Sequence, residues 1–227
     1  MVTTSFDPFL AAASEIVIQT DGKIIAVGQS YDDVGDFALA RYNIDGSLDT
    51  SFDAEGKVTT MISIHSDYAA SVTLQPDGKI IAAGTVYFVA DGSNADFGLV
   101  RYFSNGAIDS SFGINGIVTT DLSSSDYIHS IKMQSDGKII VAGMSGNNPE
   151  YFFTLLRYNN SGDLDTTFGI DGIVTINVGD DIEYATELSI LPYGSIIVSG
   201  SAYIDGVKRF CRNKLNSEGK MWIIIWN

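Results

Sequence analysis

The chain has 227 residues, enough for one large or two small domains with a substantial core. Acidic side chains outnumber basic ones by 28 to 13, and the net charge of −15 excludes nucleic acid and anionic membrane surfaces as favourable partners. The single cysteine, Cys211, cannot form an internal disulfide, the longest apolar run, residues 222–226, is too short to span a bilayer, and no secretion signal is visible in this chain.

A ten-residue segment built around an Asp-Gly pair recurs along the chain. It occupies residues 19–28, 75–84 and 134–143, and a decayed copy occupies residues 191–200. The aspartate position falls at 21, 77, 136 and, as tyrosine, 193, which sets a period of about 57 residues over the whole chain. We therefore expect about four structural repeats.

Each repeat contains four β-prone segments in the same order. Residues 14–19 and 71–75 precede the Asp-Gly pair, which is a strong hairpin signal. The next strand, at 23–28 and its copies, is continuously apolar, as expected when both faces are covered. A third strand lies at 37–42, 97–102 and 153–158, and a fourth begins at Val58, Val118 and Val174. No segment has a helical period, so the sequence predicts an all-β fold.

The linker between the third and fourth strands keeps one length in three repeats. We expect Leu48 and Phe52 to pack under the edge of the sheet and Asp49 to cap a tight turn. An arginine at the end of the third strand and an aspartate in the linker recur in three repeats. This predicts three structural ion pairs: Arg41–Asp49, Arg101–Asp109 and Arg157–Asp165. The alternative is a carboxylate-binding arginine triad such as that of sialidase propellers, but those arginines come from unlike positions.

Repeats of 40 to 60 residues with four antiparallel strands, covered on both faces, are typical of β-propeller blades. The sequence predicts a fragment of such a fold, in an open arc. The alternative is a closed ring in which residues 2–4 form the outer strand of the fourth blade. The blades are expected at residues 14–62, 69–121 and 128–178, with a partial blade at 184–215. Residues 1–4 resemble the last strand of a preceding blade, and residues 216–227 form an aberrant tail.

The repeated motifs also resemble a known family. Asp-Gly-Lys-Ile-Ile-x-x-Gly, Phe-x-Leu-x-Arg-Tyr, Asp-Gly-Ser-Leu-Asp-Thr-Ser-Phe and Gly-x-Val-Thr-Thr, in that order, are similar to the bacterial delta-60 repeat, described as a β-propeller domain of unknown function. In the fourth repeat, Tyr193-Gly194-Ser195 departs from the pattern. The resemblance implies an extracellular or cell-surface protein to which further blades belong.

The loop between the second and third strands is the part that varies in length. Residues 31–36, 86–95, 145–151 and 202–207 therefore form a candidate recognition rim, because binding residues concentrate on surface loops of rigid scaffolds. The alternative is that these loops vary because nothing constrains them.

Few residues suggest chemistry. Residues 43–49 and 159–165 are dense in oxygen ligands, but they lack the order of a calcium-binding EF-hand, and turn formation explains them better. His65 and His129 occupy different places in their repeats, so we expect loop residues and no zinc site. Cys211 has no histidine partner that the sequence reveals. We predict no catalytic, cofactor or metal site.

These features favour a non-catalytic repeat scaffold or interaction module with a protein or glycan ligand, no nucleic acid and no membrane insertion. The alternative is a carbohydrate-active or lactonase-like propeller enzyme with an axial calcium. For the core, we expect burial of the paired isoleucines on the second strands and of the linker phenylalanines, namely Ile24, Ile25, Ile80, Ile81, Ile139, Ile140, Ile196, Ile197, Phe52, Phe112 and Phe168.

The last seven residues, 221–227, contain both tryptophans and a triple isoleucine where the other repeats have Asp-x-x-Phe. A reading frame shifted by two bases restores a hydrophobic-Asp-x-x-hydrophobic pattern there, so we hypothesise a frameshift. The alternative is a natural apolar tail that covers the open edge of the fourth blade.

Overall fold

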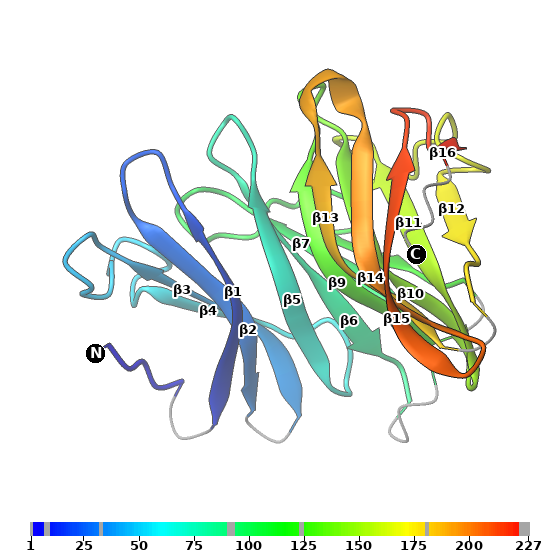
Figure 1. Cartoon of the computed structure of the whole chain (residues 1–227). Coiled ribbons are helices and arrows are strands. Elements are labelled where there is room, and N and C mark those ends of the chain that lie inside the picture. The colour runs from blue at the N-terminus through cyan, green and yellow to red at the C-terminus, as the bar shows by residue number, and fades with distance from the viewer. Residues whose placement is uncertain are drawn as a thin grey trace. The chain divides into compact units, whose positions relative to one another are not determined.

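The computed structural model describes residues 2–6, 10–31, 34–89, 94–122, 125–179 and 182–222. Their regular structure consists of strands and one short 3-10 turn, η1 (Pro192–Gly194). The strands form four antiparallel four-stranded sheets, which confirms the all-β fold of a β-propeller fragment (Figure 1). The chain divides into two compact units, Met1–Thr120 and Asp121–Asn227, each with two sheets.

The first unit contains sheets 1 and 2. Sheet 1 has the order β1-β2-β3-β4, with strands β1 (Ala11–Ile18), β2 (Ile24–Tyr31), β3 (Gly35–Tyr42) and β4 (Lys57–Thr60). Sheet 2 has the order β5-β6-β7-β8, with strands β5 (Asp67–Leu74), β6 (Ile80–Tyr87), β7 (Ala95–Tyr102) and β8 (Ile117–Thr120). The second and third strands are those that the sequence predicts, whereas the first strands begin three to four residues earlier.

The second unit contains sheets 3 and 4. Sheet 3 consists of β9 (Ser125–Met133), β10 (Ile139–Asn147), β11 (Glu150–Tyr158) and β12 (Ile173–Ile176). Sheet 4 consists of β13 (Glu183–Ile190), β14 (Ile196–Ile204), β15 (Val207–Leu215) and β16 (Met221–Trp222). Among the described residues of both units, no helix is long and apolar enough to cross a membrane.

A β-bulge in the first strand explains the glycine at the end of each Asp-Gly-Lys-Ile-Ile-x-x-Gly motif. In sheet 2 the pairing of β5 with β6 shifts between Ala69 and Ser71, opposite Gly84. A Cβ on Gly84 would lie 1.9 Å from the Tyr68 carbonyl oxygen, so only glycine fits there. The bulge also breaks the alternation of inward and outward side chains, and this is why the start of the first strand is hard to predict from sequence.

Each core lies between the two sheets of one unit. In the first unit, Ile25, Val27 and Leu39 of sheet 1 pack with Ile80 and Ala82 of sheet 2. In the second unit the equivalent cluster joins sheets 3 and 4, and it includes Ile140, Phe153, Leu155, Ile196 and Val198. In both units the second strands thus supply the centre of a core between two sheets that are consecutive in the chain.

The core prediction is confirmed with two exceptions. The linker phenylalanines and six of the isoleucines are fully buried: Phe52, Phe112, Phe168, Ile25, Ile80, Ile81, Ile139, Ile140 and Ile196. Ile24 and Ile197 are only half-buried. Ile24 lies on the face of sheet 1 that sheet 2 does not cover. Ile197 lies on the face of sheet 4 that sheet 3 does not cover. Burial of this motif therefore depends on the presence of a neighbouring sheet.

Sheet 4 differs from the others at its outer edge. The pairing of Leu215 with Met221 in sheet 4 matches the isolated bridge between Tyr42 and Leu48 in the sheet 1 linker. β16 is therefore the counterpart of that bridge and not of β4. The turn before it keeps the repeat pattern, with Gly219 N donating to Asn216 O as Gly46 N donates to Asn43 O. The frameshift hypothesis concerns residues 221–227, of which 223–227 lie outside the described part of the chain.

Candidate functional site

The repeated arginine lies at the centre of a compact polar cluster in each of the first three sheets. In sheet 1, Arg41 Nε donates to Asp49 Oδ2 at 2.7 Å, and Lys23 Nζ reaches the same oxygen at 2.7 Å. The Ser51 hydroxyl donates to the other oxygen, Asp49 Oδ1, at 2.7 Å. Sheets 2 and 3 repeat the ion pair, with Arg101–Asp109 at 2.8 Å and Arg157–Asp165 at 2.7 Å. The predicted structural ion pairs are confirmed.

Two of these arginines, Arg41 and Arg157, also connect their sheet to the next sheet of the same unit. Arg41 Nη1 donates to the carbonyl of Ser104 in sheet 2, and Arg157 Nη1 donates to the carbonyl of Ser217 in sheet 4. The Arg41 guanidinium lies 4.7 Å from the centre of the buried Phe52 ring, a cation–π contact. Since each guanidinium is engaged on several sides, it has little capacity left for a ligand carboxylate.

Hydrogen bonds hold these aspartates in the ionised state. The Lys23 ammonium, followed by the Ser51 hydroxyl, lowers the pKa of Asp49 far below its ordinary range. Burial opposes ionisation of Asp165, but the hydrogen bonds from Lys138 and Thr167 outweigh it, so the pKa of Asp165 is also strongly lowered. The aspartate of each cluster is thus ionised at neutral pH, where it pairs with its arginine.

The linker turns use their oxygen atoms internally. The Asp45 carboxylate accepts hydrogen bonds from the Ser47 amide at 2.9 Å and the Ser47 hydroxyl at 2.7 Å. Asn159 Oδ1 accepts from the Ser161 amide at 2.9 Å in the same way. These are the turn contacts that the sequence predicts. The expected burial of Leu48 is only partial, and Ile108 in the same register is 39% exposed, because only the phenylalanine of the linker enters the core.

Half-exposed tyrosines mark the opposite end of the sheets, at the loops of variable length. Tyr68, Tyr127 and Tyr184 lie near the start of the first strand in sheets 2, 3 and 4, and each directly follows an acidic residue. We call them the rim tyrosines. In the first unit, the Tyr68 ring lies 6.3 Å from that of Tyr87, at the end of β6. In the second unit, the Tyr127 ring lies 6.2 Å from that of Tyr151 in β11. Both pairs are within the range of favourable aromatic contacts.

A buried acidic residue anchors each rim tyrosine. Asp67, directly before Tyr68, is fully buried, and its Oδ2 accepts the amides of Ile62 at 2.9 Å and Ser63 at 2.8 Å. Burial raises the pKa of Asp67, although these hydrogen bonds oppose the rise.

The same arrangement recurs in the second unit. Asp126 accepts the Leu122 amide at 2.8 Å, and Glu183 accepts the Val178 amide at 2.7 Å. In each of these sheets, the carboxylate thus binds backbone amides four or five residues earlier in the chain, and this holds the backbone next to the tyrosine.

In sheet 4, a cation replaces the second aromatic ring. Lys208 Nζ lies 4.8 Å from the centre of the Tyr184 ring, and it also donates a hydrogen bond to the Tyr184 hydroxyl. This hydrogen bond lowers the pKa of Tyr184. The rim positions therefore share a scaffold but differ in chemistry from sheet to sheet.

The rim tyrosines are absent from the sequence-based prediction, which placed the rim in the loops alone. A signal exists in the sequence: Asp67-Tyr68, Asp126-Tyr127 and Glu183-Tyr184 recur at the repeat period. Of the predicted rim, residues 32–33 and 90–93 lie outside the described part of the chain, whereas Tyr31 and Phe88 are 40% and 42% exposed.

One prediction on the histidines is wrong. His129 belongs to strand β9, and its Nδ1 lies 2.8 Å from the Ala185 carbonyl oxygen, whereas His65 lies in a bend as expected. Burial lowers the pKa of His129. Cys211 lies in β15, half-buried, and burial raises the pKa of its thiol. Neither residue has the setting of an activated nucleophile or base.

Comparisons with known proteins agree with this architecture. Residues 19–52, 75–112 and 134–168 match a family described as a β-propeller domain of unknown function, DUF5122. Each matched segment runs from the first hairpin turn to the buried linker phenylalanine. No curated protein matches the chain.

Several solved structures are similar in fold. An ulvan lyase of polysaccharide lyase family PL25 has a TM-score of 0.58 at 8% identity, over 92% of this chain and 53% of that one. The intramolecular trans-sialidase of Ruminococcus gnavus gives 0.56 at 11% identity, over 93% and 44%. A gluconolactonase of Xanthomonas campestris gives 0.53 at 11% identity, over 92% and 60%.

The chain thus spans about half the length of these proteins. At such low identity the likeness concerns the fold alone. The chain is a β-propeller repeat segment, and its three best-preserved repeats match a propeller family whose function is unknown.

Proposed function

We propose that this chain is a non-catalytic interaction module whose rim tyrosines contact a protein or glycan ligand. The observation that carries the proposal is the division of labour between the two ends of the sheets. At the linker end, the Arg41–Asp49 cluster and its two copies are buried and serve as structural joints. At the rim, tyrosines remain half-exposed above a fixed backbone.

Tyrosine suits such a role for physical reasons. Its ring offers a flat apolar face and its hydroxyl offers a hydrogen bond, which makes tyrosine common in protein interfaces and ligand sites. The ring also loses little conformational freedom when it is already held by a neighbour, as Tyr68 is by Tyr87. The net charge of −15 disfavours nucleic acid and anionic lipid as the ligand.

The resemblance to the delta-60 repeat supports a bacterial surface or secreted protein as the parent, with this segment displayed outside the cell. The alternative function is a carbohydrate-active or lactonase-like enzyme with an axial calcium. The similarity to solved enzymes is one of fold only and does not decide between the two functions. The enzyme is therefore one of the outcomes that the following experiment can detect.

The test is a glycan array probed with the whole chain and with two variants. Tyr68→Ser removes a rim tyrosine, and Tyr193→Ser is the matched control because Tyr193 is a fully exposed tyrosine in the turn at the other end of sheet 4. We expect Tyr68→Ser to weaken retention about tenfold and Tyr193→Ser to leave it unchanged.

Two results would point elsewhere. Equal loss with both variants would show that binding is not at the rim. Release of shortened or rearranged glycan, together with tight calcium binding in a calorimetric titration, would favour the enzyme.

A further inference from the structure

We propose that copies of this chain associate head to tail through their terminal sheets. The outer face of sheet 4, which sheet 3 does not cover, docks in the next copy on the face of sheet 1 that sheet 2 does not cover. Phe210 inserts into a pocket at Gly28, and the N-terminal segment completes the edge of the docked sheet. The occupant of the pocket is thus a second copy of this chain.

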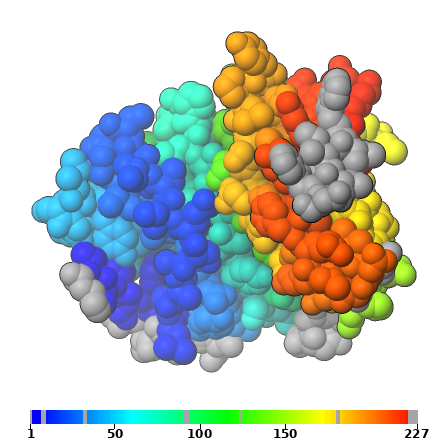
Figure 2. All heavy atoms as spheres, viewed as in Figure 1, coloured from blue at the N-terminus to red at the C-terminus, as the bar shows by residue number. Residues whose placement is uncertain are grey.

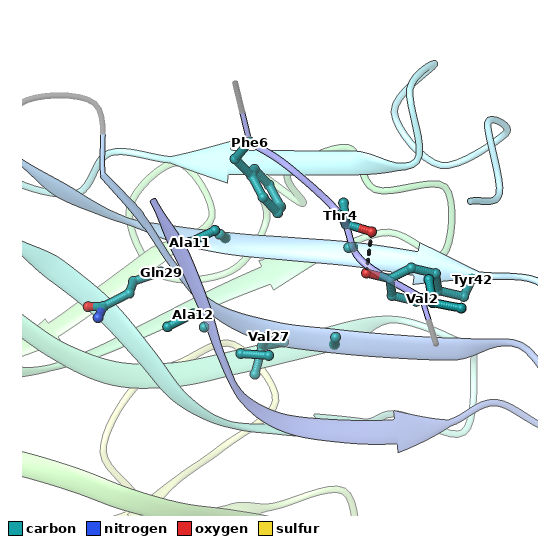
Figure 3. Close-up of a pocket in the computed structure, with 13 residues that line it drawn as sticks. Val2, Thr4, Phe6, Ala11, Ala12, Val27, Gln29 and Tyr42 are labelled. Carbon is teal, nitrogen blue, oxygen red and sulfur yellow. Dashed lines mark hydrogen bonds between the residues drawn. The ribbon is translucent and has the colours of Figure 1, made fainter. Parts of the chain in front are cut away.

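The first observation is an open pocket on sheet 1. A pocket of about 210 Å³ is lined by small residues such as Ala13, Ala26, Gly28 and Ala40, and Figure 3 shows Ala12 and Val27 beside it. Residues in the same register are covered in other sheets. Ile16 is 59% exposed in sheet 1, whereas its equivalents Val72 in sheet 2 and Leu188 in sheet 4 are 3% and 0% exposed.

The second observation is an exposed aromatic residue on sheet 4 that matches this pocket. Phe210 is 75% exposed, whereas Phe37 and Phe153 in the same register are fully buried. Phe153 shows what such a ring does when a neighbouring sheet is present. Its Cε1 would lie 2.9 Å from a Cβ on Gly200, so the ring packs directly on that glycine. Gly28 is the equivalent of Gly200, and it lines the pocket of sheet 1.

The third observation is the position of the N-terminal segment. Thr4 Oγ1 lies 2.7 Å from the Tyr42 hydroxyl in sheet 1 (Figure 3). In the same way, Thr60 Oγ1 of β4 lies 2.8 Å from the Tyr102 hydroxyl in sheet 2. Val2 Cγ2 lies 3.0 Å from a Cβ built on Gly46.

The second unit has the same contact. There, Val174 Cγ2 of β12 lies 2.8 Å from a Cβ built on Gly219. The N-terminal segment thus makes the contacts on sheet 1 that the outer strand of a preceding sheet makes elsewhere.

These observations are complementary. Among the described residues, sheet 1 carries a segment that makes the contacts of a preceding sheet's outer strand, whereas sheet 4 has three full strands and no counterpart of β4. Strands β1 and β2 of sheet 1 reach the surface of the first unit, and strands β14 and β15 of sheet 4 reach the surface of the second unit (Figure 2).

Charge supports the same pairing. In the internal joint Arg41 donates to a backbone carbonyl of the next sheet, and Lys214 occupies the register of Arg41 in sheet 4. Lys214 can donate to the turn of the second copy in the same way. The contact joins two different surfaces, so repeated contacts either close into a ring or continue as an open assembly. A ring of two copies would contain eight sheets.

The test is sedimentation velocity of the whole chain in a dilution series, compared with two surface variants. Phe210→Ser removes the inserted ring and leaves the pocket intact. Ala13→Arg blocks the pocket and leaves Phe210 intact, and both positions are exposed, so folding is preserved. Val207→Ser, 53% exposed on the same strand as Phe210, is the control.

We expect the parent chain and Val207→Ser to sediment above the monomer mass of 24.4 kDa, and each of the other variants to associate about tenfold more weakly or worse. A mixture of Phe210→Ser with Ala13→Arg has one intact junction, so it should recover a dimer and nothing larger. A monomeric parent chain, undiminished association of Phe210→Ser, or a mixture that stays monomeric would each overturn the proposal.

Discussion

The two ends of the sheets follow opposite rules. At the linker end, the three arginine–aspartate clusters repeat with nearly the same distances, and the phenylalanine beneath each guanidinium is fully buried. At the rim, the backbone anchor repeats but the second side chain changes from Tyr87 to Tyr151 to Lys208. Repetition thus marks the residues that connect the two sheets of a unit, whereas variation marks the surface that we propose for recognition.

The largest expected effect comes from breaking a linker cluster. Arg41→Ala removes one of the two cations that contact the buried Asp49 carboxylate, together with the link to sheet 2, so we expect it to lower the free energy of unfolding by about 3–5 kcal/mol. Lys214→Ala, at the same register of sheet 4, should cost less than about 0.5 kcal/mol because the aspartate position there is occupied by Trp222. Urea denaturation of both variants gives the comparison. Equal costs would contradict the structural role of the cluster.

A second pair of variants tests the core between the two ends. Ile140→Ala removes a fully buried side chain and should lower the free energy of unfolding by about 2–5 kcal/mol. Ile197→Ala, in the same register of sheet 4, should cost less than about 1 kcal/mol at a concentration where the chain is monomeric, because Ile197 is then only half-buried. Denaturant unfolding of each variant provides the test. A similar cost for both would mean that sheet 4 has a covered outer face.

Acid should weaken the linker end specifically. The pKa of Asp165 is lower in the folded state than in the unfolded chain, so its stabilisation is present above the unfolded pKa of about 3.9 and is lost as the pH falls toward the folded value. We expect the free energy of unfolding to decrease between about pH 5 and about pH 3, and to decrease less in Asp165→Asn. Identical pH slopes for the two proteins would show that the carboxylate does not stabilise the fold.

The smallest effect on stability is expected at the rim. Tyr68→Ser removes a half-exposed ring, and we expect a change of less than about 1 kcal/mol in the free energy of unfolding. Thermal unfolding measures it. A loss as large as that of Arg41→Ala would assign the rim tyrosine to the core, and would remove the distinction between the two ends.

The sequence predicts most of the repeated framework because short-range patterns determine it. The apolar second strands, the linker register and the buried Phe52, Phe112 and Phe168 follow from spacing alone. The half-burial of Ile24 and Ile197 does not, since it depends on which neighbouring sheet is present.

The rim was harder to predict for a different reason. The bulge in each first strand interrupts the alternating pattern, so Tyr68 and His129 fall in segments that look like loops. The anchoring of Tyr68 by Asp67 also depends on backbone amides of a preceding loop, which no side-chain pattern reveals.

Amide hydrogen exchange of the whole chain tests the contrast between the two ends most directly. In the sheet 1 linker, the Arg41, Asp49, Phe52 and Gly56 amides all donate to backbone carbonyls, so this segment should exchange slowly, close to the rate of global unfolding. The exposed rim residues Met61, Ile64 and Val89 should exchange much faster. Equal protection of the linker and the rim, or a linker that exchanges faster than the rim, would contradict the account.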